Sequence, residues 1–219
     1  MKVKAAWGIT GAGHYLKETF DMVRNISRSG NVSVTTFLTR AGVEVVKAYG
    51  LWNALREISP GGYYQEIFTD GDQGASAFKA GRFFRGIYRF LLVSPATANT
   101  VAKIVHGIAD TLVTNAVAEA QRGSVPIVIL PTDLREGIVE TTFPYSRNGD
   151  ECIGQSNAMV QGERVRAKVR SLDVRNSELL QAMEGIIVIK HPSEIENVLR
   201  PFLTREMDKT AENTPSRIL

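Results

Sequence analysis

The sequence predicts an α/β fold: a doubly wound parallel sheet of the Rossmann or flavodoxin type, with helices on both faces in three αβα layers. Short apolar runs at 3–9, 32–38, 90–93 and 125–130 alternate with segments whose apolar residues recur at helical spacing. A polar or glycine-containing turn follows each run. Because strands that alternate with helices pair in parallel, these turns should meet at the sheet edge where such folds bind ligands.

The bulk composition sets limits on size and partners. The 219 residues suit one domain, expected at 1–203, followed by a polar tail at 204–219. The 26 Lys and Arg against 23 Asp and Glu give a net charge of only +3, scattered along the chain, which argues against nucleic-acid binding. Neither a membrane span nor a signal peptide is recognisable in the sequence. The single cysteine excludes an internal disulfide and a cluster held only by this chain's thiolates. We therefore expect a cytoplasmic protein and no metal cluster.

The first apolar run ends in Thr10-Gly11-Ala12-Gly13, and a helical pattern follows from Leu16 to Ile26. We interpret this as a strand, a glycine turn and a helix. Glycine permits a positive φ and a close approach of the backbone to a ligand. A short glycine turn of this kind is weak evidence by itself, because any tight strand-to-helix turn can use it.

The second run, at 32–38, precedes Thr39-Arg40-Ala41-Gly42 and another helical pattern. Thr39 stands where a hydroxyl either caps the helix or holds a phosphate at the helix N-terminus. The next segment, 59–81, is rich in Gly, Tyr and Asp and predicts a long excursion with short irregular pieces. Its Tyr63 and Tyr64 either stack on a planar ring or pack on a neighbouring subunit.

The apolar run at 90–93 leads into Ser94-Pro95-Ala96-Thr97-Ala98-Asn99-Thr100. Apolar residues from Val101 to Val117 then recur at helical spacing, which predicts one helix that includes His106. Four polar residues in seven positions exceed what one helix cap requires, so a ligand is the better explanation for this turn.

The remaining chain continues the alternation. Residues 121–124 predict a helix stop with Gly123 in the left-handed conformation. The pattern loosens over 135–170, where Cys152 is either a packed apolar residue or a reactive thiol. Beyond it the patterns predict a helix at 177–183, a strand at 185–189 and a helix at 192–203.

The motifs at 8–13 and 94–116 together resemble the FMN-binding flavoprotein superfamily of cysteine decarboxylases, flavin prenyltransferases and archaeal-type flavoproteins. The closest branch is that of archaeoflavoproteins and dihydromethanopterin reductases. The resemblance implies noncovalent FMN and a homo-oligomer built from trimers. It also implies the FMN-binding residues Thr10, Gly11, Ala12, Gly13, Thr39, Ser94, Pro95, Ala96, Thr97, Asn99, Thr100 and Asp133.

The resemblance also separates the activities of this superfamily. No histidine lies between residues 59 and 94, where its decarboxylases carry one. Asn115 and Thr132 stand where the resemblance places prenyltransferase arginines. We therefore expect an FMN-dependent oxidoreductase that reduces dihydromethanopterin by hydride transfer from reduced FMN. An unidentified electron donor would then reduce the FMN again. The expected pterin-binding residues are Tyr63, Tyr64, Arg135 and Tyr145. A flavin prenyltransferase and an electron-transfer flavoprotein remain the alternatives.

Overall fold

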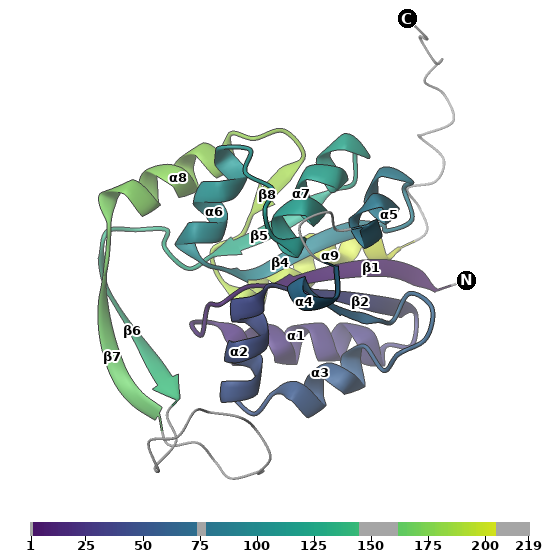
Figure 1. Cartoon of the computed structure of the whole chain (residues 1–219), viewed down its shortest axis with the longest axis horizontal. Helices are drawn as coiled ribbons and strands as arrows, with labels where there is room; N and C mark the ends of the chain where they lie inside the picture. Colours follow the sequence, from purple (N-terminus) through teal and green to yellow (C-terminus); the bar gives the residue numbers. More distant parts are fainter. Residues whose placement is uncertain (1, 74–77, 145–161, 205–219) are drawn as a thin grey trace, which may run out of the picture.

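The computed structural model describes residues 2–73, 78–144 and 162–204. Its centre is a six-stranded sheet with the spatial order β3-β2-β1-β4-β5-β8, in which every neighbouring pair is parallel (Figure 1). The strands are β1 (Val3–Ile9), β2 (Val32–Leu38), β3 (Ile67–Thr69), β4 (Phe90–Ala96), β5 (Ile127–Pro131) and β8 (Ile186–Val188). The predicted doubly wound α/β fold is confirmed.

Helices cover both faces of the sheet (Figure 1). The described helices are α1 (Leu16–Arg28), α2 (Arg40–Ala48), α3 (Trp52–Ile58), α4 (Asp70–Gln73), α5 (Gly81–Phe84), α6 (Ala98–Val105), α7 (Leu112–Arg122), α8 (Ser171–Gln181) and α9 (Ile195–Leu203), with 3₁₀ turns η1 (Phe78–Ala80) and η2 (Pro192–Glu194). Apolar side chains of α1, α3 and α9 form one core layer, and those of α5, α6, α7 and α8 form the other.

The strand and helix patterns have simple physical causes. All seven residues of β4 are buried, because helices cover the sheet on both sides, and such strands are continuously apolar. In α1 the residues Leu16, Phe20, Val23 and Ile26 are buried at the spacing expected of a helix with one apolar face. Each fully buried side chain of this size contributes about 1.5–3 kcal/mol.

The chain changes direction in the middle of the sheet. From β1 it moves outward through β2 to β3, then returns to β4 on the other side of β1 and continues through β5 to β8. The carboxyl ends of β1 and β4 therefore flank the point where the strand order reverses. In open α/β sheets the ligand binds in the crevice at this point.

The long helix predicted after residue 97 is in fact two helices. The helix α6 ends at Val105, His106 is its exposed C-terminal cap, and α7 begins at Leu112. Gly107 between them has a φ of 69°, which a helix cannot include. The apolar residues keep helical spacing on both sides of the break, so periodicity alone does not reveal it.

The helix stop at 121–124 exists, but the left-handed residue is different from the predicted one. Ser124 has the positive φ of 52°, whereas Gly123 has a φ of −88°. Gly123 is required for space, since a Cβ there would collide with the backbone of Phe83 and Phe84. The prediction of a left-handed Gly123 was therefore wrong.

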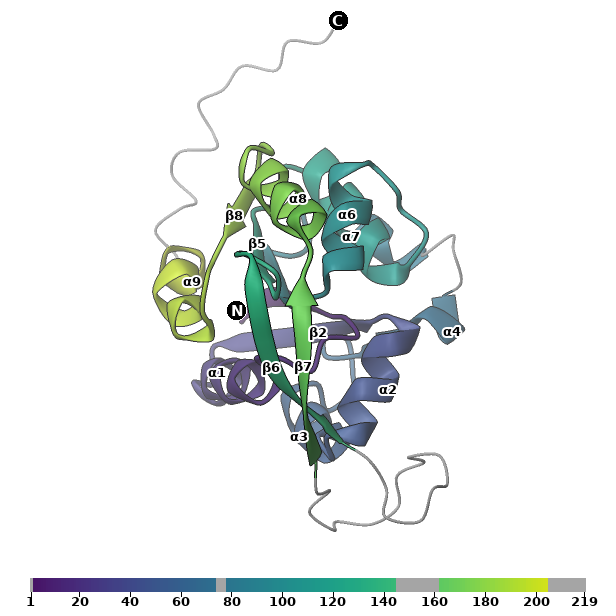
Figure 2. The ribbon, with the colours of Figure 1, turned by 90° about the vertical axis from the view of Figure 1, so that its left-hand side faces the viewer.

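Two segments contain strands that the sequence pattern did not predict. The excursion at 59–81 includes the edge strand β3, only three residues long. The loosely patterned segment at 135–170 includes β6 (Gly137–Pro144) and β7 (Gly162–Val169), an antiparallel ribbon that projects from the carboxyl edge of the sheet (Figures 1 and 2). Tyr145, Cys152 and residues 205–219 lie outside the described residues.

Candidate functional site

Four turns meet at the carboxyl edge of the sheet and are joined by hydrogen bonds. Thr39 N–H donates to the carbonyl of Ile9 at 3.1 Å, which links the turn after β2 to the end of β1. Thr132 N–H donates to the carbonyl of Ala96 at 3.0 Å, which links the turn after β5 to the end of β4. These bonds, with the Thr10 contacts described next, bring together the turns that the sequence predicted to converge.

Thr10 is the central polar residue of this edge. Its hydroxyl donates to the carbonyl of Pro95 at 2.8 Å and accepts from the backbone N–H of Thr97 at 3.0 Å. The side chain is 1 % exposed. Because the Pro95 carbonyl lies near the end of β4 and the Thr97 N–H lies in the turn after it, the hydroxyl of Thr10 fixes the end of β4 and that turn against β1.

Residues 94–96 belong to the strand rather than to the turn. Ser94 and Ala96 are fully buried, and the Ser94–Pro95 peptide bond is cis. The Ser94 hydroxyl pairs with that of Thr19 at 2.9 Å, and its carbonyl accepts from Trp7 Nε1 at 2.9 Å. The polar groups of Ser94 therefore hold α1 and β1 to β4, and they act on a ligand through the position of the turn.

The turn proper consists of Thr97, Asn99 and Thr100 at the start of α6. Thr97 caps the helix, its hydroxyl accepting from Thr100 N–H at 3.2 Å and lying 3.0 Å from the Thr100 hydroxyl. Thr100 is buried, whereas Asn99 is exposed. Its side chain makes no hydrogen bond to the residues that the structure describes, so its amide is available to a ligand.

The glycines of the first turn are needed for close packing against α2. A Cβ on Gly11 would lie 2.7 Å from Ala41 Cβ, and one on Gly13 would collide with the ring of Tyr49. Neither glycine has a positive φ, so the conformational freedom expected of them is not what this turn uses. The first turn of α2 consequently fixes the shape of the loop after β1.

Helix α1 differs in its cap from α2 and α6. Thr39 and Thr97 accept hydrogen bonds from the first turns of α2 and α6. The cap of α1 is Tyr15, with a φ of 65° and no side-chain hydrogen bond to the helix. The first-turn N–H groups of α1 therefore have no side-chain partner, which suits an anion such as phosphate. The sequence signal was the absence of a capping residue type before Leu16.

A titratable cluster lies beside this helix start. The His14 ring packs on Tyr15 with 3.8 Å between ring centroids, and Tyr15 contacts His191 edge-on at 5.3 Å. Burial lowers the pKa of His14 below its ordinary value, and the charges of Glu18 and Asp133 partly oppose this shift. The cluster joins the turns after β1, β5 and β8; the sequence singles out His14 as a residue near the flavin, but not its neighbours Tyr15 and His191.

Asp133 is held by its neighbours in the turn after β5. Its Oδ2 accepts from the Thr132 hydroxyl at 2.6 Å, and its backbone carbonyl accepts from the Ser177 hydroxyl of α8 at 2.9 Å. Arg135, two residues further, is exposed on the same edge. Both residues lie in the segment between β5 and β6.

The structure does not bring Tyr63 and Tyr64 to this edge. Lys4 Nζ lies 4.1 Å from the centre of the Tyr64 ring, and the Arg82 guanidinium lies 5.3 Å from that of Tyr63. Lys4 precedes Ile9 by five residues, or about 17 Å along β1. The two tyrosines thus lie at the opposite edge of the sheet from these turns of the same chain, and the pterin contact expected of them stays a prediction. Tyr145 is outside the described residues.

Asn115 and Thr132, which replace the expected prenyltransferase arginines, are both used to shape loops. Asn115 Nδ2 donates to the carbonyls of Ala109 and Thr111 at 2.8 and 2.9 Å. The Thr132 hydroxyl donates to Asp133 Oδ2 at 2.6 Å.

No helix in the described part of the chain is long and apolar enough to cross a membrane. The described residues also contain no group of three or more His, Cys, Asp and Glu side chains placed to hold a metal ion.

The fold and this edge define a nucleotide-cofactor protein of the doubly wound α/β class. The model of the Flavoprotein family matches residues 1–135, and the chain belongs to that family. It is 38% identical over 233 residues to the dihydromethanopterin reductase (acceptor) of Methanocaldococcus jannaschii, with 89% of this chain and 95% of that protein covered. The Methanosarcina mazei protein of the same name is 36% identical over 232 residues, covering 88% and 97%.

One solved structure is similar over nearly the whole chain. It is Burkholderia xenovorans DmrB in complex with FMN, described as a cubic protein cage for redox transfer. The TM-score is 0.69 at 27% sequence identity, and the match covers 91% of this chain and 94% of that chain.

Proposed function

We propose that this protein is an FMN-dependent dihydromethanopterin reductase. The observation that carries the proposal is the identity of 36–38% to two reductases of that name across almost their full length. Reduced FMN, when bound, would supply the hydride that reduces the pterin ring, and a proton from the surroundings would complete the reduction. The protein then has to bind the flavin, orient the pterin over it and exclude competing reactions.

The residues of the carboxyl edge fit a flavin nucleotide. The uncapped first turn of α1 offers backbone N–H groups to a single phosphate. The Gly11–Gly13 loop packs closely on α2, because a Cβ on either glycine would collide with Ala41 or Tyr49, and this packing fixes the loop beside the start of α1. Asn99 presents an amide at the start of α6 for the polar rim of the ring system.

We assign FMN-binding roles to the turns at 10–13, 39, 94–100 and 133, with different tasks. Thr10, Ser94 and Thr97 shape the turns through the bonds described above. Asn99 and the α1 N-terminus contact the cofactor directly. Arg135 is the proposed cation for an anionic group of the pterin substrate, by charge-assisted hydrogen bonding.

The titratable groups beside the site, His14, His191 and Asp133, are not needed to carry the hydride, because the flavin does so. A prenyltransferase has to hold a second phosphate, for which fixed positive charge is needed. Asn115 and Thr132 supply none. We propose a homo-oligomeric assembly built from trimers, and the cage formed by the similar DmrB supports an oligomer.

Steady-state kinetics test the proposed function. If electron donor and pterin use one space over the flavin, they bind alternately and give parallel double-reciprocal lines at several fixed donor concentrations. Intersecting lines would mean that both are bound together at separate sites. Mass analysis of the released chromophore should find FMN, and finding FAD would contradict the cofactor assignment.

A further inference from the structure

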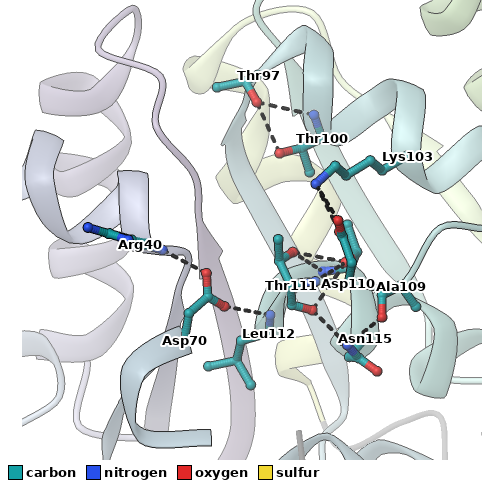
Figure 3. A network of polar contacts seen from close by, with 11 residues as sticks. Arg40, Asp70, Thr97, Thr100, Lys103, Ala109, Asp110, Thr111, Leu112 and Asn115 are labelled. Carbon is teal, nitrogen blue, oxygen red and sulfur yellow. Dashed lines mark hydrogen bonds and ion pairs between the residues drawn. The ribbon is translucent and has the colours of Figure 1, made fainter. Parts of the chain in front are cut away.

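Asp70 joins the first turns of two helices that begin at different places in the fold (Figure 3). It is the first residue of α4 and follows the edge strand β3. Its Oδ2 accepts from the backbone N–H of Arg40, in the first turn of α2, at 2.7 Å. Its Oδ1 accepts from the backbone N–H of Leu112, in the first turn of α7, also at 2.7 Å. One carboxylate thus bridges two helix N-termini.

Both helices touch the proposed flavin loop or the strand that carries it. The first turn of α2 packs so closely that a Cβ on Gly11 would lie 2.7 Å from Ala41, and a Cβ on Gly42 would lie 2.5 Å from the carbonyl of Ile9. The first turn of α7 packs on β1, where a Cβ on Gly8 would lie 3.2 Å from Val113 Cγ1. Any shift of either helix start would therefore reach the end of β1 and the turn after it.

The carboxylate also neutralises the positive ends of these two helices. Oxygen atoms with negative charge are stabilised near helix N-termini, where N–H groups lack partners. The start of α7 is further fixed by the reciprocal Thr111–Thr114 capping box, and the loop before it by the ion pair between Lys103 and Asp110 at 2.8 Å (Figure 3). Among the contacts drawn in Figure 3, those of Asp70 connect this α6–α7 unit to α2.

We infer that Asp70 is a positioning residue for the flavin site, acting as a built-in anion that clamps α2 and α7 on either side of the glycine loop. The inference rests on the FMN site of the proposed function and does not depend on the pterin reaction. Within the described part of the chain its carboxylate accepts from the backbone N–H groups of Arg40 and Leu112 alone, so we assign it the shaping of the loop and no contact with the cofactor.

The isosteric variant Asp70→Asn tests the clamp with little change in volume. The asparagine side chain has one acceptor oxygen, whereas two backbone N–H groups, those of Arg40 and Leu112, need an acceptor. One of these N–H groups would therefore face the NH₂ group of the asparagine. We expect FMN to bind about tenfold more weakly, the effect of losing one charge-assisted hydrogen bond. The matched control is Asp72→Asn on the same helix, whose carboxylate accepts from Thr69 at 2.7 and 3.1 Å and should leave FMN affinity unchanged.

The variant Asp70→Ala adds a readout that a general loss of folding would not give. Sodium formate should restore part of its FMN affinity, because a small carboxylate can occupy the vacated place, whereas sodium chloride at equal ionic strength should not. Equal FMN affinity of wild type and Asp70→Asn, or no difference between formate and chloride, would overturn the inference.

Hydrogen exchange on the apoprotein tests the clamp independently of the flavin. Amides at the starts of α2 and α7 should exchange faster in Asp70→Asn than in wild type, with α1 unchanged. Unchanged exchange at both helix starts would overturn the inference even if flavin binding fell. A wild-type protein that takes up no FMN would instead contradict the proposed function, and the exchange comparison would still decide whether Asp70 holds the two helices.

Discussion

The two edges of the sheet use polar residues in opposite ways. At the amino edge, Arg82 donates to both carboxylate oxygens of Glu66 at 2.8 and 3.1 Å and to the Tyr88 hydroxyl at 3.2 Å. The aromatic rings of Tyr63 and Tyr64 lie 5.3 and 5.2 Å from its guanidinium. At the carboxyl edge, the first turn of α1 and the Asn99 amide keep unused hydrogen-bonding capacity.

This difference separates a structural cluster from a binding site. Burial raises the pKa of Glu66, but the hydrogen bonds from Arg82 and from backbone groups at Glu66 and Tyr64, with the charge of Arg82, together lower it by more, so the net pKa lies below its ordinary value. The amino-edge groups satisfy one another and leave little for a ligand. The carboxyl edge keeps backbone N–H groups at the start of α1 and the Asn99 amide without side-chain partners, which suits an anionic cofactor.

The largest effect is expected at the amino edge, from Arg82→Met. Removing one member of a mostly buried ion pair leaves Glu66 without its partner, so the free energy of unfolding should fall by about 3 kcal/mol. FMN affinity should be unchanged, because this cluster is far from the carboxyl edge. Chemical denaturation and flavin titration measure both, with the exposed Arg85→Met as control. A loss of FMN binding without loss of stability would contradict the structural role.

At the carboxyl edge, Thr10→Val should lower both stability and flavin affinity. The substitution leaves the Pro95 carbonyl and the Thr97 N–H without their partner, at about 1–3 kcal/mol. The matched control is Thr36→Val, which removes a buried hydroxyl bonded to Ser59 at 2.7 Å and should lower stability alone. Equal flavin affinities for the two variants would mean that the Thr10 bridge does not shape the site.

Asn99→Ala tests direct contact with the cofactor. Because Asn99 is exposed, the variant should keep its stability and lose roughly fivefold or more in FMN affinity, from one hydrogen bond of about 1 kcal/mol. Asn53→Ala, the second residue of α3, is the control for substitution of an exposed Asn at a helix start. Full flavin occupancy of Asn99→Ala on dilution would show that Asn99 does not bind the flavin.

The smallest effect concerns pH. Burial lowers the pKa of His14 below its ordinary value of 6.5, so the folded protein binds this proton less readily than the unfolded chain does. His14 therefore favours folding fully above pH 6.5, and this contribution is lost as the pH falls through the lowered pKa of the folded state. In His14→Gln the free energy of unfolding should fall less steeply below pH 6.5. Identical pH profiles of wild type and variant would contradict this assignment.

Much of the fold follows from local patterns in the sequence. The buried run at 90–93 and the alternation of strands and helices predict a parallel sheet, and parallel pairing alone places the turns on one edge. Elements whose stability depends on distant partners show no apolar periodicity in the local sequence, so they were not predicted. The strand β3 has three residues and is defined by its pairing with β2, and the β6–β7 ribbon is defined by mutual pairing.

The candidate site was predictable by position more than by role. Thr97 and Thr10 were singled out as polar turn residues, but only the three-dimensional contacts show that they bond within the turns. The place of Tyr63 and Tyr64 was not predictable, because their rings pack against Arg82, which is 18 or more positions away in the sequence. Asp70 bonds to Arg40, 30 positions before it, and to Leu112, 42 positions after it. Contacts over such distances leave no pattern in the local sequence.

The most direct test of the proposed function is anaerobic mixing of the photoreduced, FMN-loaded protein with dihydromethanopterin, followed by flavin absorbance. The account predicts that the oxidised flavin spectrum returns, that tetrahydromethanopterin forms in equal amount, and that intact mass shows no covalent adduct. A prenyl phosphate in place of the pterin should leave the reduced spectrum unchanged. Failure of dihydromethanopterin and other dihydropterins to reoxidise the flavin would contradict the assignment as a reductase.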